Sequence, residues 1–569
     1  MGLSGALQIG RSGLMAHQAA IEVTGNNLAN LATRGYHRQV IGLAPSQTQH
    51  IGGGIHMGRG VEVATIQRAV DAALESRLRA SVGDQAASFA RTDILGQIEA
   101  LQNELSDIDL STALNQFFNA WSDLANQPLD NSLRSLLVQQ GSKLGSFIRG
   151  LRDSEVELRN QVDQQIDQAT IATNDLLTRI ESINAEIAAA EGGGSLAGGA
   201  SALRDQRDLL LGELSEYLDL SIVEQNNGVV DIFVGSLPIV LNGTSRGVEV
   251  KRETVNGELQ IQVVVADDGS PLQATSGKIG ALIASRDTDV GEAIGAIDQF
   301  ANQLIFQINR LHSQGQGLSG FNSIAGTNGV LDTTVALNDA QTGLNFTPVH
   351  GSFKLHLTQV STGQRNTAAI DVDLDGIGTD TSLDDLVTAI NGIANVSATL
   401  TADGRLKLDG ASADFEISFS EDTSGVLATL GINSFFTGGD GSDIDVNSIV
   451  AADGGKVAAA LGHVPGDNRN ALAIAALRTE GVADLNGLSL SELWSQHIED
   501  FAIRLGQSSS QVEADTIVRE SLEAQQQSLS GVNPDEEAIN LLSFQRAYQG
   551  SARFLTVVDE MLETLLGLI

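Results

Sequence analysis

The 569-residue sequence contains no cysteine. This absence excludes disulfides, thiolate metal sites and cysteine nucleophiles, while it leaves the compartment open. Proline, with seven residues, and aromatic residues, at 4%, are also scarce, which favours helices packed through small side chains and modest β domains. No stretch reaches the apolar length of a membrane span. The opening MGLSGALQIGRSGLM has neither a basic segment nor a continuous apolar one, so we expect no cleaved signal peptide.

Basic residues are few as well. The chain has 33 Lys and Arg against 71 Asp and Glu, a net charge of −38, and such a field repels nucleic acid and anionic lipid. Neither nucleic acid nor a membrane is therefore expected as a partner. Hydrophobic residues make up 42% of the chain, enough to build cores in about two to four domains of ordinary size.

Both ends of the chain carry the spacing of a coiled-coil seam, with steps of four and three residues. At the N-terminal end the apolar members are Leu3, Leu7, Leu14, Ile21, Leu28 and Leu31, and the other members are Gly10, His17 and Thr24. At the C-terminal end they are Leu541, Phe544, Tyr548, Leu555, Val558, Leu562, Leu565 and Ile569, with Ser551 as the polar member. Each helix can instead pack onto its own globular domain. We predict that the two ends pair and that their remaining apolar surface orders against neighbouring subunits.

The C-terminal helix has an explicit start signal. Asn533 stands at the N-cap position, Pro534 at the first helical position, and three acidic residues follow at the positive end of the helix dipole. The sequence therefore predicts one helix from this point to the end of the chain.

Between the ends, helical periods dominate. Residues 151–190 contain neither Gly nor Pro and predict a long rod-like helix, whereas residues 221–285 alternate like strands. We assign 58–320 and 455–530 to an elongated helical bundle with that β segment inside it.

Residues 335–445 alternate like strands around a single helical face and predict a small α+β insertion. The predicted fold is mainly α with an inserted β-rich domain. Its nested layout has a terminal coiled-coil domain (1–36 with 533–569) outside, the helical body next and the insertion innermost. This nesting predicts both chain ends at one pole and the insertion at the other.

A calcium loop is the first candidate metal site. Asp371, Asp373, Asp375 and Gly376 match the first half of an EF-hand loop, but Ser382 stands where the bidentate Glu is required. We expect a turn that leads into a helix capped by Ser382, and calcium titration calorimetry tests the alternative.

No other segment predicts an active site. His17, His37, His50 and His56 lack the short spacing of a zinc site, so we expect polar seam or surface positions for them. The segment GGGIHMGRG (52–60) has no phosphate-loop motif, and neither a nucleophile elbow nor H-E-x-x-H occurs. We expect no catalytic, cofactor-binding or metal-binding residues. An enzyme carried in the insertion would need a clustered site that the sequence does not contain.

The segment NNLANLATRGY (26–36) resembles the signature of the axial proteins of the bacterial flagellum, in which a helix with N-N-x-A-N ends in T-x-G-[YF]. The matching residues are Asn26, Asn27, Ala29, Asn30, Thr33, Gly35 and Tyr36. Gly35 can take the left-handed conformation that closes a helix, and the polar side chains can bind the freed backbone groups. We predict that the segment joins the terminal coiled coil to the body.

Central motifs distinguish among the axial proteins. Five segments are similar, in their order along the chain, to segments of the flagellar hook-associated protein 1 family. They are LNQFFNAWSDLANQP, ALRDQRDLLLGELSEYLDL, GKIGALIASRD, INRLHSQG and LGINSFFTG. Rod and hook proteins share the two ends but not these motifs. They remain the alternative, as does an insertion that also acts as an adhesin.

The resemblance implies a non-enzymatic extracellular protein that forms the junction between hook and filament. The implied partners are further copies of the chain in a helical ring, the hook protein and the second hook-associated protein. It also implies export through the flagellar type III apparatus with a cytoplasmic chaperone.

Overall fold

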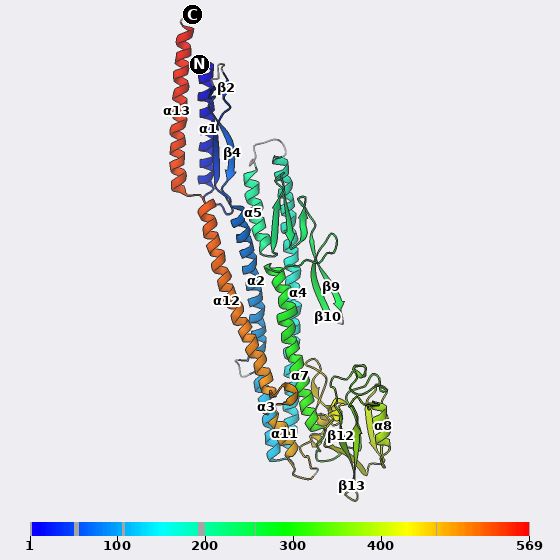
Figure 1. Ribbon diagram of the computed structural model, residues 1–569. Helices are drawn as coiled ribbons and strands as arrows, with labels where there is room; N and C mark the ends of the chain where they lie inside the picture. Colours follow the sequence, from blue (N-terminus) through cyan, green and yellow to red (C-terminus); the bar gives the residue numbers. More distant parts are fainter. Residues whose placement is uncertain are drawn as a thin grey trace. The chain divides into compact units, whose positions relative to one another are not determined.

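The computed structural model describes residues 3–50, 56–104, 108–191, 200–255, 258–462 and 464–567 (Figure 1). The chain forms two compact units. Unit 1 consists of Met1–Asp93, Gln161–Arg286 and Gln507–Ile569, and unit 2 of Ile94–Asn160 and Asp287–Gly506. No helix in these described stretches is both long and apolar enough to cross a membrane.

Unit 1 contains both ends of the chain. Helix α1 (Leu3–Ala29) packs along α13 (Pro534–Leu566), and we call these two helices the terminal pair. Asn533 caps α13 by accepting a hydrogen bond from the Asp535 N–H, as predicted. Strands β1 (Gln39–Pro45) and β4 (Val61–Arg68) form an antiparallel ribbon against α1, and β2 (Gln49–His50) pairs with β3 (His56–Met57).

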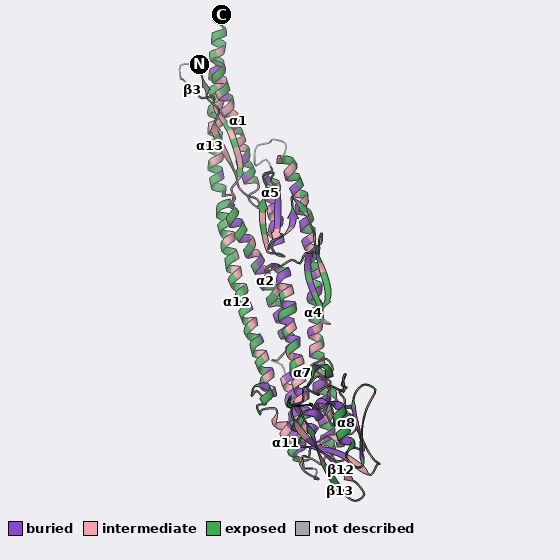
Figure 2. Cartoon of the chain, turned by 45° about the vertical axis from the view of Figure 1, so that its right-hand side comes forward, coloured by how far each residue is buried: buried purple, intermediate pink, exposed green. Residues whose placement is uncertain are grey.

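The rest of unit 1 is built from long helices and small sheets. Helices α2 (Ala72–Gln102), α4 (Asn131–Glu191) and α12 (Leu490–Ser530) each contribute residues to both units, and α5 (Ser201–Ser215) belongs to unit 1. The long helix predicted from 151 is confirmed within α4. Exposed residues run along α12 and α13 (Figure 2). The sheets comprise β5 (Leu220–Glu224), β6 (Val230–Val234), β7 (Leu237–Leu241) and β8 (Thr244–Ser245) in that order, and the separate ribbon of β9 (Val248–Val255) and β10 (Glu258–Val265).

The β segment predicted for 221–285 is wrong at its end. Helix α6 (Gly277–Ala284) occupies the last residues, followed by a π-helix, η1 (Ser285–Val290), and α7 (Gly291–His312). The apolar run IGALIA is too short for periodicity to separate a buried strand from a buried helix.

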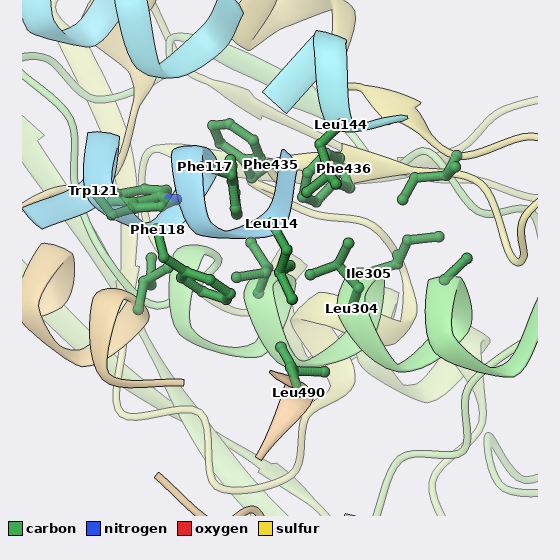
Figure 3. Close-up of a cluster of buried hydrophobic side chains, with 14 of the residues drawn as sticks. Leu114, Phe117, Phe118, Trp121, Leu144, Leu304, Ile305, Phe435, Phe436 and Leu490 are labelled. Carbon is green, nitrogen blue, oxygen red and sulfur yellow. The ribbon is translucent and has the colours of Figure 1, made fainter. Parts of the chain in front are cut away.

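The core of unit 2 is aromatic. Helix α3 (Leu110–Asn126) buries Phe117 and Trp121 on one face (Figure 3). The Phe435 and Phe436 rings, 4.9 Å apart, pack against them, although both residues fall within the bounds predicted for the insertion, 335–445. Helices α7 and α11 (Arg469–Ala476) complete this cluster. The first α-helix after residue 456 begins only at Arg469, because Lys456 itself lies in the 3₁₀ turn η3 (Gly454–Lys456).

The insertion has its own core and two three-stranded sheets. One has the order β13 (Gln364–Val372), β12 (Gly351–Gln359), β16 (Phe415–Ser420). The other has the order β11 (Ser323–Ala325), β15 (Leu406–Gly410), β14 (Val396–Leu400), with α8 (Leu383–Asn391) beside β14 and with β11 lying before the predicted start of the insertion at 335. The predicted strands and helix are confirmed. Shorter elements of unit 2 are η2 (Ala340–Thr342), α9 (Val426–Thr429), β17 (Phe436–Thr437), β18 (Asp445–Val446), α10 (Ser448–Ala452) and η4 (Ala483–Leu485).

A buried polar network ties the insertion to α7. The fully buried His312 ring places Nδ1 2.8 Å from the Asn433 carbonyl, and its Nε2 accepts the Ala458 N–H at 2.9 Å. The Asn433 side chain donates to the carbonyls of His312, Ser313 and Gly315. Burial lowers the pKa of His312 to about 4, so the ring is neutral at physiological pH.

Candidate functional site: the terminal pair and its anchor

The terminal pair packs large side chains of α13 against small residues of α1. Val558 is buried on α13, and the other seam members up to Leu562 are half-buried: Leu541, Phe544, Tyr548, Ser551, Leu555 and Leu562. Leu565 is 46% exposed, and Ile569 lies outside the described residues.

On α1 the buried line consists of Gly10, Gly13, Ala16, Ala20, Val23, Thr24 and Asn27. The predicted members Leu7, Leu14, Ile21 and Leu28 flank this line and are half-buried, and the side chain of Leu3 lies outside the described residues. Leu31 follows the end of α1 and is 49% exposed, so within one chain it lies outside the contact.

The two helices approach each other closely, which explains why the buried line on α1 differs from the predicted seam. A Cβ on Gly10 would lie 2.7 Å from Leu555 Cδ2, and one on Gly13 would lie 2.9 Å from Ser551 Oγ. The closest contact on α1 therefore follows glycine and alanine rather than leucine. A regular coiled-coil seam, and the role of its residues in assembly, stay predictions.

Asn27 of the axial signature joins three elements. Its Nδ2 donates to the Gln39 carbonyl (2.9 Å) and to Glu537 Oε2 (3.1 Å), while its Oδ1 accepts from the Gln39 N–H (2.9 Å) and the Tyr36 hydroxyl (2.7 Å). These four bonds use the full capacity of a buried amide side chain. Asn27 therefore connects α1 to β1 and α13.

The remaining signature residues shape the exit from α1. Asn30 Nδ2 donates to Asn26, Thr33 donates to Asn30, and Asn26 donates to the Tyr36 hydroxyl at 3.3 Å. Ala29 is the last residue of α1 and is exposed.

Gly35 takes the predicted left-handed conformation at φ +77°, but the prediction that it closes the helix is wrong. Gly35 lies in the turn toward β1, several residues after α1 ends, because hydrogen bonds from Asn30 and Thr33 backbone groups already turn the chain there.

A buried charge cluster lies directly after the signature. His37 Nδ1 is 2.7 Å from Asp205 Oδ1 on α5, and its Nε2 is 3.6 Å from Glu75 on α2. Burial lowers the pKa of His37, but hydrogen bonds to Asp205 and Glu75 outweigh burial and raise it to about 9. The expectation of a seam or surface position for His37 is therefore wrong. Its partners lie far away in the sequence, so spacing gave no signal.

Arg68 completes this cluster on β4. Its Nη1 lies 2.8 Å from Asp205 and 2.6 Å from Asp208. The donor atoms of His37, Asp205 and Asp208 lie close enough together to hold a metal ion, but the Arg68 guanidinium already supplies a cation to both carboxylates.

Glu537 anchors the start of α13. This carboxylate is only 2% exposed, and its Oε1 accepts from Arg38 Nε at 2.8 Å, while the Arg38 N–H donates to the Ser530 carbonyl at the end of α12. Removing one partner of a buried ion pair leaves an unpaired charge, so this arrangement strongly favours one geometry. We call the contacts of Asn27, His37, Arg38, Arg68, Glu75, Asp205, Asp208 and Glu537 the anchor.

The predicted turn before Ser382 is confirmed. Ser382 caps α8 in a capping box with Asp385, and Asp371 lies in β13 opposite Ser352 rather than in a loop. Asp373, Asp375 and His350 have donor atoms near one another on the surface of the insertion. The side chains of His50 and His56, and part of the 52–60 segment, lie outside the described residues, and His17 is half-buried on α1.

Three known protein families match separate parts of the chain. The family described as flagellar hook-associated protein FlgK helical domain matches residues 95–328. The flagella basal body rod protein family matches 7–37, and the flagellar basal body rod FlgEFG protein C-terminal family matches 525–568. The two rod families therefore cover the terminal pair.

Relatives match along the whole chain. Flagellar hook-associated protein 1 of Escherichia coli is 25% identical, with 100% of both chains aligned, and that of Bacillus subtilis is 24% identical over 99% of this chain and 97% of the relative. The flagellar hook junction protein FlgK from Burkholderia pseudomallei has a similar fold, with a TM-score of 0.52 and 16% identity over 80% of this chain and 100% of that structure. Along its whole length the chain is therefore similar to the flagellar hook-associated protein 1 relatives.

Proposed function

We propose that this chain is a structural, non-enzymatic protein of the bacterial flagellum, located outside the cell at the junction between hook and filament. The observation that supports this role most strongly is the alignment with hook-associated protein 1 relatives over their full length. The helical pairing of the two ends, where the rod protein families match, supports assembly through the termini.

The proposed mechanism is mechanical. Copies contact one another through different surfaces, and such heterologous contacts generate a helical layer. The seam residues and the exposed apolar side chains of α13 supply apolar contacts in this layer, and the anchor holds the terminal pair to α2 and α5. The proposed domains are the terminal coiled coil (1–36 with 533–569), the body (58–320 with 455–530) and the insertion (335–445).

The proposed partners are the hook protein on one side and the second hook-associated protein on the other. Export would proceed through the flagellar type III apparatus with a chaperone that holds the C-terminal helix. A chain without cysteine fits this route, since an unfolded chain in transit carries no disulfides.

Electron microscopy of cells lacking the gene, with the medium assayed for flagellin, tests the proposed role. Hooks without filaments, together with free flagellin in the medium, are expected, and the wild-type gene on a plasmid should restore filaments. Absent hooks would instead assign the chain to the rod or hook, and normal filaments would contradict a junction role.

A further inference from the structure

Strand β13 forms one edge of a sheet in the insertion, and no described strand pairs with its outer side. The hydrogen bonds of β12 show which residues of β13 face outward. The Ser352 N–H donates to Thr423 Oγ1 at 3.0 Å, and the Ser352 carbonyl accepts from the Thr423 N–H at 2.9 Å, so both groups point away from β13. Asp371 lies opposite Ser352, and its backbone groups therefore point away from β12. Because the direction alternates along a strand, the outward-facing residues are Arg365, Thr367, Ala369 and Asp371.

These four residues form what we call the open edge. All four are exposed, and their outward N–H and C=O groups form no hydrogen bond with any described residue. Proteins usually protect such an edge with proline, lysine, a bulge or a covering segment. Strand β13 has nine residues, contains neither proline nor lysine, and pairs with β12 without a register shift. The open edge is therefore complementary to the edge of another strand.

A charge of each sign lies at either end of the open edge. Arg365 Nε donates to Thr358 Oγ1 at 3.2 Å, and no described residue forms an ion pair with Arg365 or Asp371. In an antiparallel pair of two copies centred on Ala368, Arg365 of each copy lies opposite Asp371 of the other. Residues directly opposite share one face and have Cβ atoms about 5 Å apart, so both arginines gain an acidic partner. Parallel strands in register would instead place arginine opposite arginine.

A neighbouring segment limits the register. The Thr381 N–H donates to the Asp373 carbonyl at 2.7 Å, and the Asp373 N–H donates to Thr381 Oγ1 at 2.9 Å, so the open edge ends at Asp371. A shift of the pair centre to Ala369 would require the occupied groups of Asp373. A shift to Thr367 would place Arg365 opposite Ala369, and a shift of one residue would turn core-facing side chains of one copy toward the solvent face. The alignment about Ala368 satisfies all outward groups and both charge pairs.

We propose that the open edge of β13 binds the open edge of a second copy in an antiparallel, two-fold symmetric pair centred on Ala368. The two three-stranded sheets then form one continuous sheet, and the contact extends about 20 Å along the strands. The net charge of −38 opposes association, but at about 0.15 M salt charges more than about 8 Å apart are largely screened. Copies in one helical layer share one direction, so this pair forms outside a layer and does not depend on the proposed junction role.

Disulfide trapping in the full-length protein tests the pairing, because the chain has no native cysteine. Under mild oxidation, a mixture of the single variants Thr367→Cys and Ala369→Cys should give a covalent dimer containing one of each, since their Cα atoms would lie about 5.5 Å apart. Each variant alone should give no covalent dimer. The two copies of either cysteine would lie more than about 8 Å apart, too far for a disulfide.

The matched control is a mixture of the single variants Lys251→Cys and Glu253→Cys. These residues have the same spacing and are exposed on β9, a strand whose edge carries charges at successive positions. Cross-linking of Ala369→Cys alone would indicate parallel pairing in register. Either that result, or cross-linking of the test mixture no greater than in the control, would overturn the antiparallel pair.

A proline in the open edge provides an independent test. Ala369→Pro removes one outward N–H that no described residue binds, so the β12–β13 ladder should remain. Sedimentation analysis should show dimerisation at least about tenfold weaker than in the parent protein. Ala369→Ser retains the N–H and should dimerise like the parent. If the proline variant also dimerised like the parent, the open edge could not be the contact.

Charge exchange tests the register without altering the backbone. Arg365→Glu should weaken dimerisation about tenfold, because it places two acidic residues opposite each other at both ends. The double variant Arg365→Glu with Asp371→Arg should restore it, since each charge again faces its opposite. Unchanged dimerisation in the single variant, or no recovery in the double variant, would refute this register. None of these outcomes bears on filament growth in cells, so the dimer and the junction role fail separately.

Discussion

Asn27 on α1 donates a hydrogen bond of 3.1 Å to the carboxylate of Glu537 on α13, a residue 510 positions further along the chain. Both side chains are almost fully buried. The contact joins the two ends of the protein at the place where each leaves the terminal pair. It therefore fixes where α13 begins relative to the exit of α1.

Replacing Asn27 with Ala should destabilise this region by about 2 kcal/mol, because it leaves the Gln39 backbone and Glu537 with unmet hydrogen bonds. Hydrogen exchange should become faster in α1 and β1. The neighbouring exposed change Asn26→Ala serves as control and should cost less than about 0.5 kcal/mol. Equal effects of the two variants would contradict the central place of Asn27.

His37 should make unit 1 less stable in alkali. Its folded pKa of about 9 lies above the ordinary 6.5, so the folded state binds the proton more tightly. The contribution, about 3 kcal/mol, is complete below pH 6.5 and is lost as the pH rises through 9. Limited proteolysis between pH 6 and 9.5 measures this loss. A His37→Gln variant should be less stable at pH 6 and should vary less with pH, and an unchanged profile would refute the argument.

His312 should make unit 2 less stable in acid. Its folded pKa of about 4 lies below 6.5, so below pH 6.5 the unfolded chain takes up a proton that the folded chain does not. Stability should fall by about 3 kcal/mol as the pH drops from 6.5 to 4. Trp121, whose ring lies 6.2 Å from the His312 ring, reports unfolding by fluorescence. The control is His356→Gln in the insertion, which should leave the Trp121 signal at pH 5 unchanged. A flat pH profile in the parent protein would contradict a neutral His312.

Gly10→Ala should weaken the terminal pair, because the new methyl group would overlap Leu555. Overpacking of this kind costs about 1–3 kcal/mol. Gly5→Ala on the same helix meets nothing within 4 Å and should be neutral or stabilise α1 by about 0.5–1 kcal/mol. Exchange of α13 amides distinguishes the two variants. If the Gly10→Ala variant were instead more stable, α1 and α13 would have to separate easily around Gly10.

Local signals predicted the helix starts well. Asn533 with Pro534, and Ser382 with Asp385, are complete within a few residues, so the sequence alone identifies both caps. The long helix within α4 follows from the same kind of local signal, because residues 151–190 contain neither Gly nor Pro.

The anchor was hidden because its partners come from distant segments. His37 and Asp205 are 168 positions apart, and neither position differs from an ordinary surface residue in the sequence. The contact line on α1 was missed for a different reason. Helix spacing identifies apolar side chains, whereas the closest approach of two helices depends on the small residues between them.

Gly315 and Asn433 enclose most of the insertion and lie together, because the Asn433 side chain donates to the Gly315 carbonyl at 3.0 Å. In topological terms, the intervening segment is a closed loop whose removal would leave chain ends that a short turn can join. Any domain with similarly close termini can occupy the same place without moving α7. Whole domains can therefore be exchanged at this position, by evolution or by design. A fluorescent or affinity domain grafted there should leave the aromatic core of unit 2 intact.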